Sequence, residues 1–124
     1  MAVYTSYYAK AKDLRWKFAC ISISRKTPGW FYTDGEIQEL FPSWDIIMGS
    51  KNGRLSWEQY TALYKQQLNQ VDKQKVWNHL HKVEEVTGKD ILLLCYERPE
   101  ANCHRHIVAD WLGYGVREYT GGTE

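Results

Sequence analysis

Apolar and polar residues recur along the chain with two different periods, which predict strands in some segments and helices in others. Val3–Tyr8 and Phe18–Ser24 are rich in β-branched and aromatic residues, a composition typical of strands. Asp90–Tyr96 is a short, almost uninterrupted apolar run, which is typical of a central parallel strand buried on both faces. Val116–Thr120 is expected to form a last, short strand.

Residues 56–88 carry the spacing of amphipathic helices. Ser56 is expected to begin a capping box with Gln59, and Asp72 to cap a second helix that stops at Gly88. The apolar residues after the capping box share one helical face: Trp57, Tyr60, Tyr64, Leu68 and Val71. Their spacing predicts a core-facing surface, and it leaves open whether the region is two helices or one bent rod.

The remaining segments are less regular. Ala9–Trp16 fits a short helix or a turn, Glu36–Phe41 fits one or two helical turns that a proline stops, and residues 50–53 fit a turn. A last helix is expected to start near Cys103 and to end before Gly113.

This order of elements predicts an α/β fold, a single compact domain with a mostly parallel sheet flanked by helices. The domain is expected to span residues 1–120, with residues 121–124 as a flexible tail. Right-handed crossovers place the carboxyl ends of parallel strands along one edge of the sheet, where α/β domains bind ligands.

Composition narrows the classes of function. Sixteen Lys and Arg against fifteen Asp and Glu give a net charge of +1, which excludes a strongly basic nucleic-acid coat but leaves room for a local basic patch. Six Trp and nine Tyr exceed what the core needs, so some aromatic side chains are expected to line a cleft or an interface. Without a secretory h-region or a membrane-length apolar run, we expect a soluble cytoplasmic protein with no membrane partner.

The strongest chemical signal is the segment that follows the predicted central strand. Cys103 lies at the start of a helix, whose unpaired N–H groups favour an anion, and His104 and Arg105 follow it. Cys103 is therefore a candidate nucleophile, with His104 moving the proton and Arg105 holding an anionic group. The alternatives are an anion site without covalent chemistry and a small cysteine packed under the loop.

Cys95 ends the same strand, and seven residues separate it from Cys103. Three cysteines, an odd number, do not predict a disulfide framework. The two sulfurs are still close enough in sequence to form a redox pair or, with His104 or His106, a metal site. The spacing matches no tight zinc knuckle, so we expect no metal, and no motif indicates a cofactor.

Other candidates lie at the same predicted edge. Glu97 can act as a base or hold an arginine, Arg25 suits phosphate or carboxylate recognition, and Trp30 can stack on a base or sugar. Each has a plain alternative as a surface or loop residue. Cys20 and the Trp57 helix face are expected to be core, and His79 and His81 point in different directions on a helix.

The motifs resemble those of the bacterial, archaeal and phage family catalogued as domain of unknown function 488. The likeness rests on ILLLCYERP at Ile91–Pro99, on CHRH at residues 103–106 and on VADWL at Val108–Leu112. Shorter matches occur at YTSY, ISISR, TPGW and PSWD, so the resemblance covers roughly Val3 to Leu112. It implies a compact α/β domain but no reaction, since none is part of the family's definition. Lys26 and Thr27 replace an acidic-basic step of longer members.

The matching positions imply a set of site residues: Thr5, Ser6, Arg25, Trp30, Cys95, Glu97, Cys103, His104 and Arg105. Thr5 and Ser6 are expected to offer hydroxyls to a ligand at a strand end. The leading hypothesis is a small enzyme acting on a phosphate-bearing, nucleotide-like or nucleic-acid-derived ligand. The alternatives are a non-catalytic module that binds a nucleotide or another anion, and a phage or host interaction protein. The sequence leaves the oligomeric state open.

Overall fold

The computed structural model describes residues 1–96 and 102–121, and within them the fold is a five-stranded sheet with helices on both faces. Every strand pair within these residues is parallel, in the order β3-β2-β4-β1-β5. The strands are β1 (Val3–Tyr7), β2 (Phe18–Ser22), β3 (Gly35–Glu36), β4 (Asp90–Cys95) and β5 (Arg117–Glu118). The predicted α/β class with a mostly parallel sheet is confirmed.

β4 is the central strand, as its apolar run predicts. It pairs with β1 on one side and β2 on the other, and residues 91–95 are all buried. Cys95 lies opposite Tyr7, and Leu94 lies opposite Ser22. The carboxyl ends of the three central strands therefore meet at one edge of the sheet.

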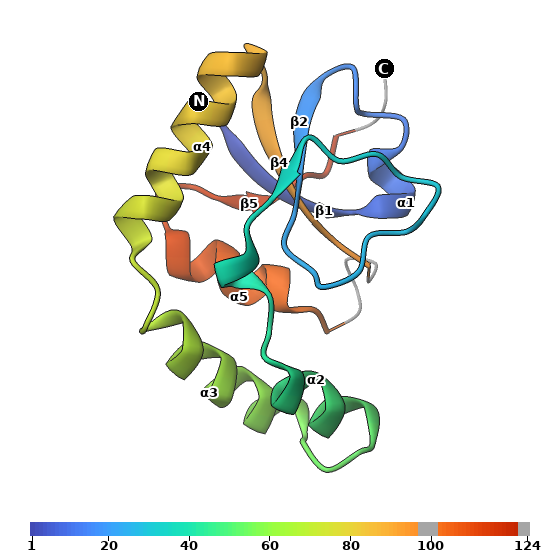
Figure 1. Cartoon of the computed structure of the whole chain (residues 1–124), viewed down its shortest axis with the longest axis vertical. Helices are drawn as coiled ribbons and strands as arrows, with labels where there is room; N and C mark the ends of the chain where they lie inside the picture. Colours follow the sequence, from blue (N-terminus) through green and yellow to red (C-terminus); the bar gives the residue numbers. More distant parts are fainter. Residues whose placement is uncertain (97–101, 122–124) are drawn as a thin grey trace.

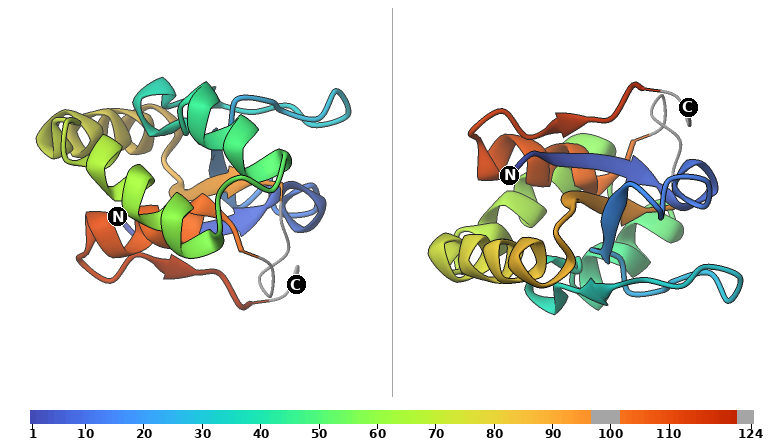
Figure 2. Two further views of the ribbon diagram at one scale, coloured as in Figure 1. Left: turned by 90° about the horizontal axis from the view of Figure 1, so that it is seen from below. Right: turned by 90° about the horizontal axis from the view of Figure 1, so that it is seen from above.

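Five α-helices and one short 3₁₀ turn, Gln38–Leu40, surround the sheet in the described part of the chain. They are α1 (Tyr8–Ala11), α2 (Trp44–Lys51), α3 (Trp57–Leu68), α4 (Lys73–Thr87) and α5 (His104–Leu112). Figure 1 shows α2 and α3 together at the foot of the molecule, with α4 along its left side. The two views in Figure 2 show the strands lying between α1 and the other helices.

The helix signals of the central region are confirmed. Ser56 and Gln59 form the capping box at the start of α3. The Asp72 side chain accepts hydrogen bonds from two backbone N–H groups at the start of α4. Gly88 ends α4 with φ +68°, a left-handed conformation that suits glycine. Since Asp72 caps a new helix, the region is two helices rather than one bent rod.

Two apolar layers hold the domain together. One packs α3, α4 and α5 against one face of the sheet, with Tyr64, Leu80 and Val108 at its centre. The other is smaller and joins α1 to the opposite face through Tyr8 and Leu92. The cysteine Cys20, expected to be core, is buried in this second layer.

Several features differ from the predicted elements. The helix α2 was not expected; it begins at Ser43, whose side chain accepts a hydrogen bond from Ile46 N at 3.3 Å. The edge strand β3 was also not expected, because its two residues are held by pairing with β2 rather than by their own β preference. The second strand ends at Ser22 rather than at Ser24.

No helix in the described part of the chain is long and apolar enough to cross a membrane. The expected tail begins at Gly121, and its last three positions lie outside the described residues.

Candidate functional site

A cleft with a volume of about 450 Å³ opens between the carboxyl edge of the sheet and the α2–α3 pair. The segment after β2 contributes Arg25 and Lys26, and the start of α5 contributes Cys103 and His104. Cys95, at the end of β4, completes the floor. The predicted site therefore lies where the strand ends meet, and several of its residues share one cavity.

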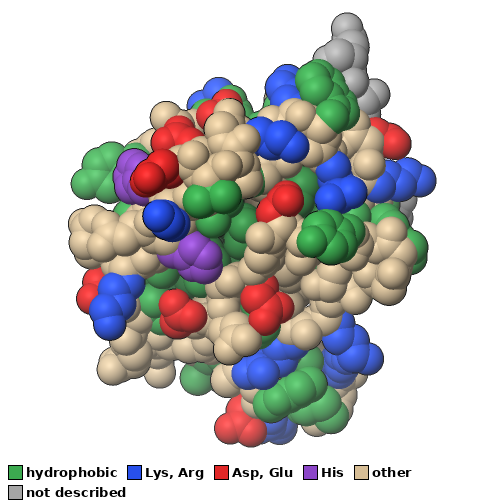
Figure 3. Space-filling model, turned by 45° about the horizontal axis from the view of Figure 1, so that its top comes forward, with side chains coloured by type: hydrophobic (Ala, Val, Ile, Leu, Met, Phe, Trp, Pro, Cys, Tyr) green, Lys and Arg blue, Asp and Glu red, His purple; other side chains and the backbone are tan. Residues whose placement is uncertain are grey.

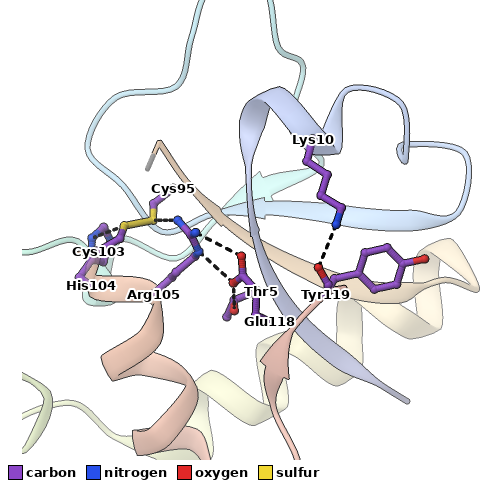
Figure 4. Close-up of polar contacts among 8 residues, drawn as sticks. All are labelled: Thr5, Lys10, Cys95, Cys103, His104, Arg105, Glu118 and Tyr119. Carbon is purple, nitrogen blue, oxygen red and sulfur yellow. Dashed lines mark hydrogen bonds and ion pairs between the residues drawn. A yellow bond between two sulfur atoms is a disulfide. The ribbon is translucent and has the colours of Figure 1, made fainter. Parts of the chain in front are cut away.

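Cys95 and Cys103 are joined by a disulfide (Figure 4). Cys95 is the last residue of β4, and Cys103 is the N-cap of α5. Both side chains are buried, with exposed fractions of 1% and 5%. The odd cysteine count indicated no disulfide framework, but two of the three cysteines do form a bond, because the sheet and α5 hold them against one another.

His104 lies beside this disulfide, and one of its ring nitrogens is hydrogen-bonded to the backbone. Its Nε2 is 2.6 Å from the backbone oxygen of Ile23. Because a carbonyl oxygen only accepts, Nε2 must carry the hydrogen, and Nδ1 is left with its lone pair. Nδ1 is 3.8 Å from the sulfur of Cys103. Burial lowers the pKa of His104 to about 4, so the ring is neutral at pH 7.

Arg105 lies beneath the disulfide, fully buried. Its Nη1 donates to the Cys95 sulfur at 3.2 Å, and its Nε and Nη2 donate to the two carboxylate oxygens of Glu118 at 3.0 and 3.2 Å. Thr5 donates its hydroxyl to the same carboxylate at 2.7 Å. Arg105 and Thr5 therefore both contact Glu118, and neither lines the cleft. The reason is that the first turn of α5 packs against β1 and β5, which turns this side chain inward.

Ser6, another predicted ligand contact, faces away from this network. Neighbouring residues of a strand point to opposite faces, and Thr5 faces α5, so Ser6 faces the α1 side. Its hydroxyl oxygen is buried and has no hydrogen-bond partner within the described residues. Trp30 is 61% exposed on the loop after β2, where it contacts Phe31 edge-on and does not line the cleft. Glu97 lies outside the described residues.

The rim of the cleft is basic and aromatic. The Arg25 guanidinium lies 4.7 Å from the centre of the Trp44 ring, and its Nε donates to the Pro42 oxygen at 2.8 Å. Lys26 and Lys51 add two further exposed amines. These contacts hold Arg25 at the cleft while the rest of its guanidinium remains exposed.

The cleft residues that sequence reasoning does not assign to the site include Trp44, Lys51, Trp57 and Tyr96. Trp57 was predicted to be core; it is only half-buried, and its ring stacks on Tyr60 at 4.9 Å along the cleft wall. Trp44 and Lys51 belong to α2, the helix that the pattern did not predict. The PSWD motif was the one sequence signal that included Trp44.

The two cysteine sulfurs and His104 lie close enough together to be considered as metal ligands. One ligand atom from each of Cys95, Cys103 and His104 lies within 4.8 Å of the others. As free thiolates they have the donor atoms that soft cations prefer. In this structure both sulfurs are bonded to one another, and Arg105 places a positive charge beside one of them.

A family model, DUF488-N3a, described as the "Active DUF488-N3 subclade", matches residues 8–115. The match includes β4, the two bonded cysteines, His104 and Arg105, and it leaves out Thr5, Ser6 and Glu118. No curated protein and no solved structure matches the chain. Since the matched region covers most of the chain, the protein belongs to the DUF488 family, within its DUF488-N3 subclade.

Proposed function

We propose that the protein is a cytoplasmic enzyme that acts on a phosphate-bearing, nucleotide-like ligand, with Cys103 as its nucleophile. One observation carries the proposal: Cys103 and His104 form the floor of a cleft whose rim bears Arg25, Lys26 and Lys51. The family description includes the word "active", which agrees with a catalytic role.

The cleft suits a small anionic ligand with a planar group. Its volume of about 450 Å³ lies within the range of about 300–1,000 Å³ that is usual for small-molecule sites. The basic side chains would contact a phosphate, while the exposed faces of Trp44 and Trp57 would stack on a base. On the face drawn in Figure 3, basic and acidic side chains of the described residues are interspersed. That mixture favours a single small ligand over a long nucleic acid.

The chemistry requires the reduced form of the site. The Cys103 sulfur would attack an electrophilic centre of the ligand, and His104 Nδ1 would take the thiol proton only during that attack, because its pKa of about 4 keeps the ring neutral beforehand. A sulfur–ligand bond forms, the leaving group departs with its bonding electrons, and the proton on His104 is available to it. Water then attacks the covalent intermediate and restores the thiol. A reducing cytoplasm keeps the site in this form.

The second candidate is a binding module without a covalent step. The observation that favours it is the cleft rim, because Arg25 and Trp44 are arranged independently of the sulfur chemistry. In that case the anion binds at the rim and Cys103 serves as a small residue of the floor.

The test is protection of Cys103 from alkylation. The reduced full chain is treated with iodoacetamide, alone and with inorganic phosphate, ribose 5-phosphate or adenosine 5′-monophosphate, and the modified cysteine is identified by mass spectrometry. The proposal predicts that the nucleotide slows labelling of Cys103 more than the two smaller anions do. If none of the three protects Cys103 at millimolar concentration, the proposed ligand class is wrong.

Turnover separates the two candidates. A covalent adduct on Cys103, or loss of the leaving group from a nucleotide in wild type but not in Cys103→Ser, indicates an enzyme. Equal nucleotide affinity in wild type and Cys103→Ser, without any conversion, indicates a binding module.

A further inference from the structure

We propose that Cys95 and Cys103 form a redox-active pair that undergoes thiol–disulfide exchange with a small thiol entering the cleft. This goes beyond the proposed function, because the exchange needs no nucleotide. The partner is defined by its chemistry: a low-molecular-weight thiol small enough to reach the floor of the cleft, such as glutathione.

The position of the disulfide separates it from a bond that only holds a fold together. Both cysteines line the cleft. The bond joins residues only eight apart in sequence, so it restrains a short loop and removes less chain entropy than a bond between distant segments. The strands β1, β2 and β4 are already joined by their own hydrogen-bond ladders, without help from this bond.

The two sulfurs have different surroundings, which gives the exchange a direction. Cys95 receives a hydrogen bond from the positively charged, buried Arg105 guanidinium at 3.2 Å. Cys103 lies at the start of α5 and next to His104 Nδ1. Figure 4 shows the disulfide between these two groups, with His104 on one side and Arg105 on the other.

This arrangement favours attack on Cys103. An incoming thiolate forms a bond to the Cys103 sulfur, the bond between the two cysteines breaks, and Cys95 leaves with the electron pair as a thiolate. The positive charge of Arg105 stabilises that thiolate. A second thiol then attacks the mixed disulfide at the sulfur of the bound thiol. This releases a low-molecular-weight disulfide and leaves Cys103 reduced, and protons from solvent complete the dithiol. Overall, two thiols are oxidised and one protein disulfide is reduced.

Cys20 is a matched control within the same chain. It is fully buried in β2, and burial raises the pKa of its thiol to about 12. It therefore has neither the access nor the thiolate that exchange requires. Alkylation or oxidation of Cys20 would therefore indicate unfolding rather than exchange at the cleft.

The experiment is a redox titration of the full chain in glutathione buffers, from fully reduced to fully oxidised. Samples are quenched with acid and alkylated, the intact mass counts the free thiols, and peptide mapping assigns them. The inference predicts a single two-electron transition of Cys95 and Cys103 within the glutathione range, with Cys20 unlabelled in the folded protein and the circular dichroism unchanged. A disulfide that resists excess reduced glutathione until the chain unfolds would overturn it. So would a pair that never forms with oxidised glutathione, or stoichiometric zinc bound to the two thiols.

Single variants test the direction of attack. With oxidised glutathione, Cys95→Ser should accumulate a glutathione adduct on Cys103 at least tenfold more than Cys103→Ser accumulates one on Cys95. Cys20→Ser should behave as wild type. Equal adduct levels in the first two variants would contradict the assigned direction of attack. The redox titration uses the wild-type protein, so it does not depend on whether these variants fold. If the titration shows the predicted transition but no nucleotide protects Cys103 from alkylation, the exchange activity stands and the proposed ligand class is wrong.

Discussion

His104 Nε2 lies 2.6 Å from the backbone oxygen of Ile23, and this contact turns the other ring nitrogen toward the sulfur of Cys103. The carbonyl belongs to the segment just after β2, while His104 is the first residue of α5. A backbone atom of one element therefore sets the tautomer of a side chain on another. The same contact keeps a neutral histidine buried. This should lower the free energy of unfolding at acidic pH.

The free energy of unfolding should decrease as the pH is lowered, because of His104. Its pKa is about 4 in the folded protein and 6.5 in the unfolded chain, so only the unfolded chain binds a proton between these values. The stabilisation is complete above pH 6.5 and is lost as the pH falls toward 4, by at most about 3 kcal/mol. Urea unfolding of the wild type between pH 7.5 and pH 4.5 measures this slope.

The control for that slope is His104→Gln, which has no titrating ring. It should be less stable than wild type at pH 7.5 but should lose less stability on acidification. Burial also lowers the pKa of His106, so a smaller acid sensitivity should remain in the variant. Parallel pH profiles for wild type and variant would show that His104 does not titrate differently on folding.

Removing the carboxylate of Glu118 should destabilise the domain strongly. This carboxylate pairs with Arg105, whose side chain is 0% exposed, and accepts the Thr5 hydroxyl. Glu118→Ala removes the carboxylate that accepts two hydrogen bonds from this buried guanidinium, a loss that typically costs about 3 kcal/mol. Glu85→Ala, at an exposed position on α4, should change the free energy of unfolding by less than about 0.5 kcal/mol. Equal effects in the two variants would show that the Arg105–Glu118 pair adds little.

Two cleft-rim substitutions should weaken nucleotide binding without harming the fold. Arg25→Ala removes a cation, and Trp44→Ala removes both a stacking surface and the ring that holds Arg25. Each should raise the Kd for adenosine 5′-monophosphate about tenfold, while the exposed Lys82→Ala on α4 should not change it. Calorimetry at two salt concentrations measures this, and Arg25→Ala should also reduce the salt dependence. Unchanged affinity in both rim variants would place the ligand elsewhere.

Much of the site follows from local patterns. The apolar run of β4 and the helix start at Cys103 are both readable within a few residues. Together with the rule that parallel strands end at one edge, they bring Cys95, Cys103 and His104 together. The contacts that hold Arg105 are not local in sequence. Glu118 is 13 residues from Arg105, and only the packing of α5 against β5 shows that the arginine is paired there.

The cleft wall was harder to predict for a similar reason. Residues 44–51 are a short helix with a weakly amphipathic pattern and a glycine, Gly49, that packs closely on Leu55. The N-cap residue Ser43 is the main helix signal in this segment, and alone it does not associate Trp44 and Lys51 with the site. Trp57 has the spacing of a core residue, and only the packing of α2 beside α3 shows that one side of its ring faces the cleft.

The pH dependence of Cys103 alkylation in the reduced protein tests the central claim most directly. The rate of iodoacetamide labelling is measured from pH 5 to pH 10, with peptide mapping to separate Cys103 from Cys95 and Cys20. We expect a midpoint well below the value of about 8.5 for a free cysteine, because the start of α5 and the positive charge of Arg105 favour a thiolate. His104→Gln should leave the midpoint nearly unchanged, because the His104 ring is neutral in this range. A midpoint at or above about 8.5, or no labelling of Cys103 in the folded protein, would contradict an activated thiol and leave the cleft as a binding site.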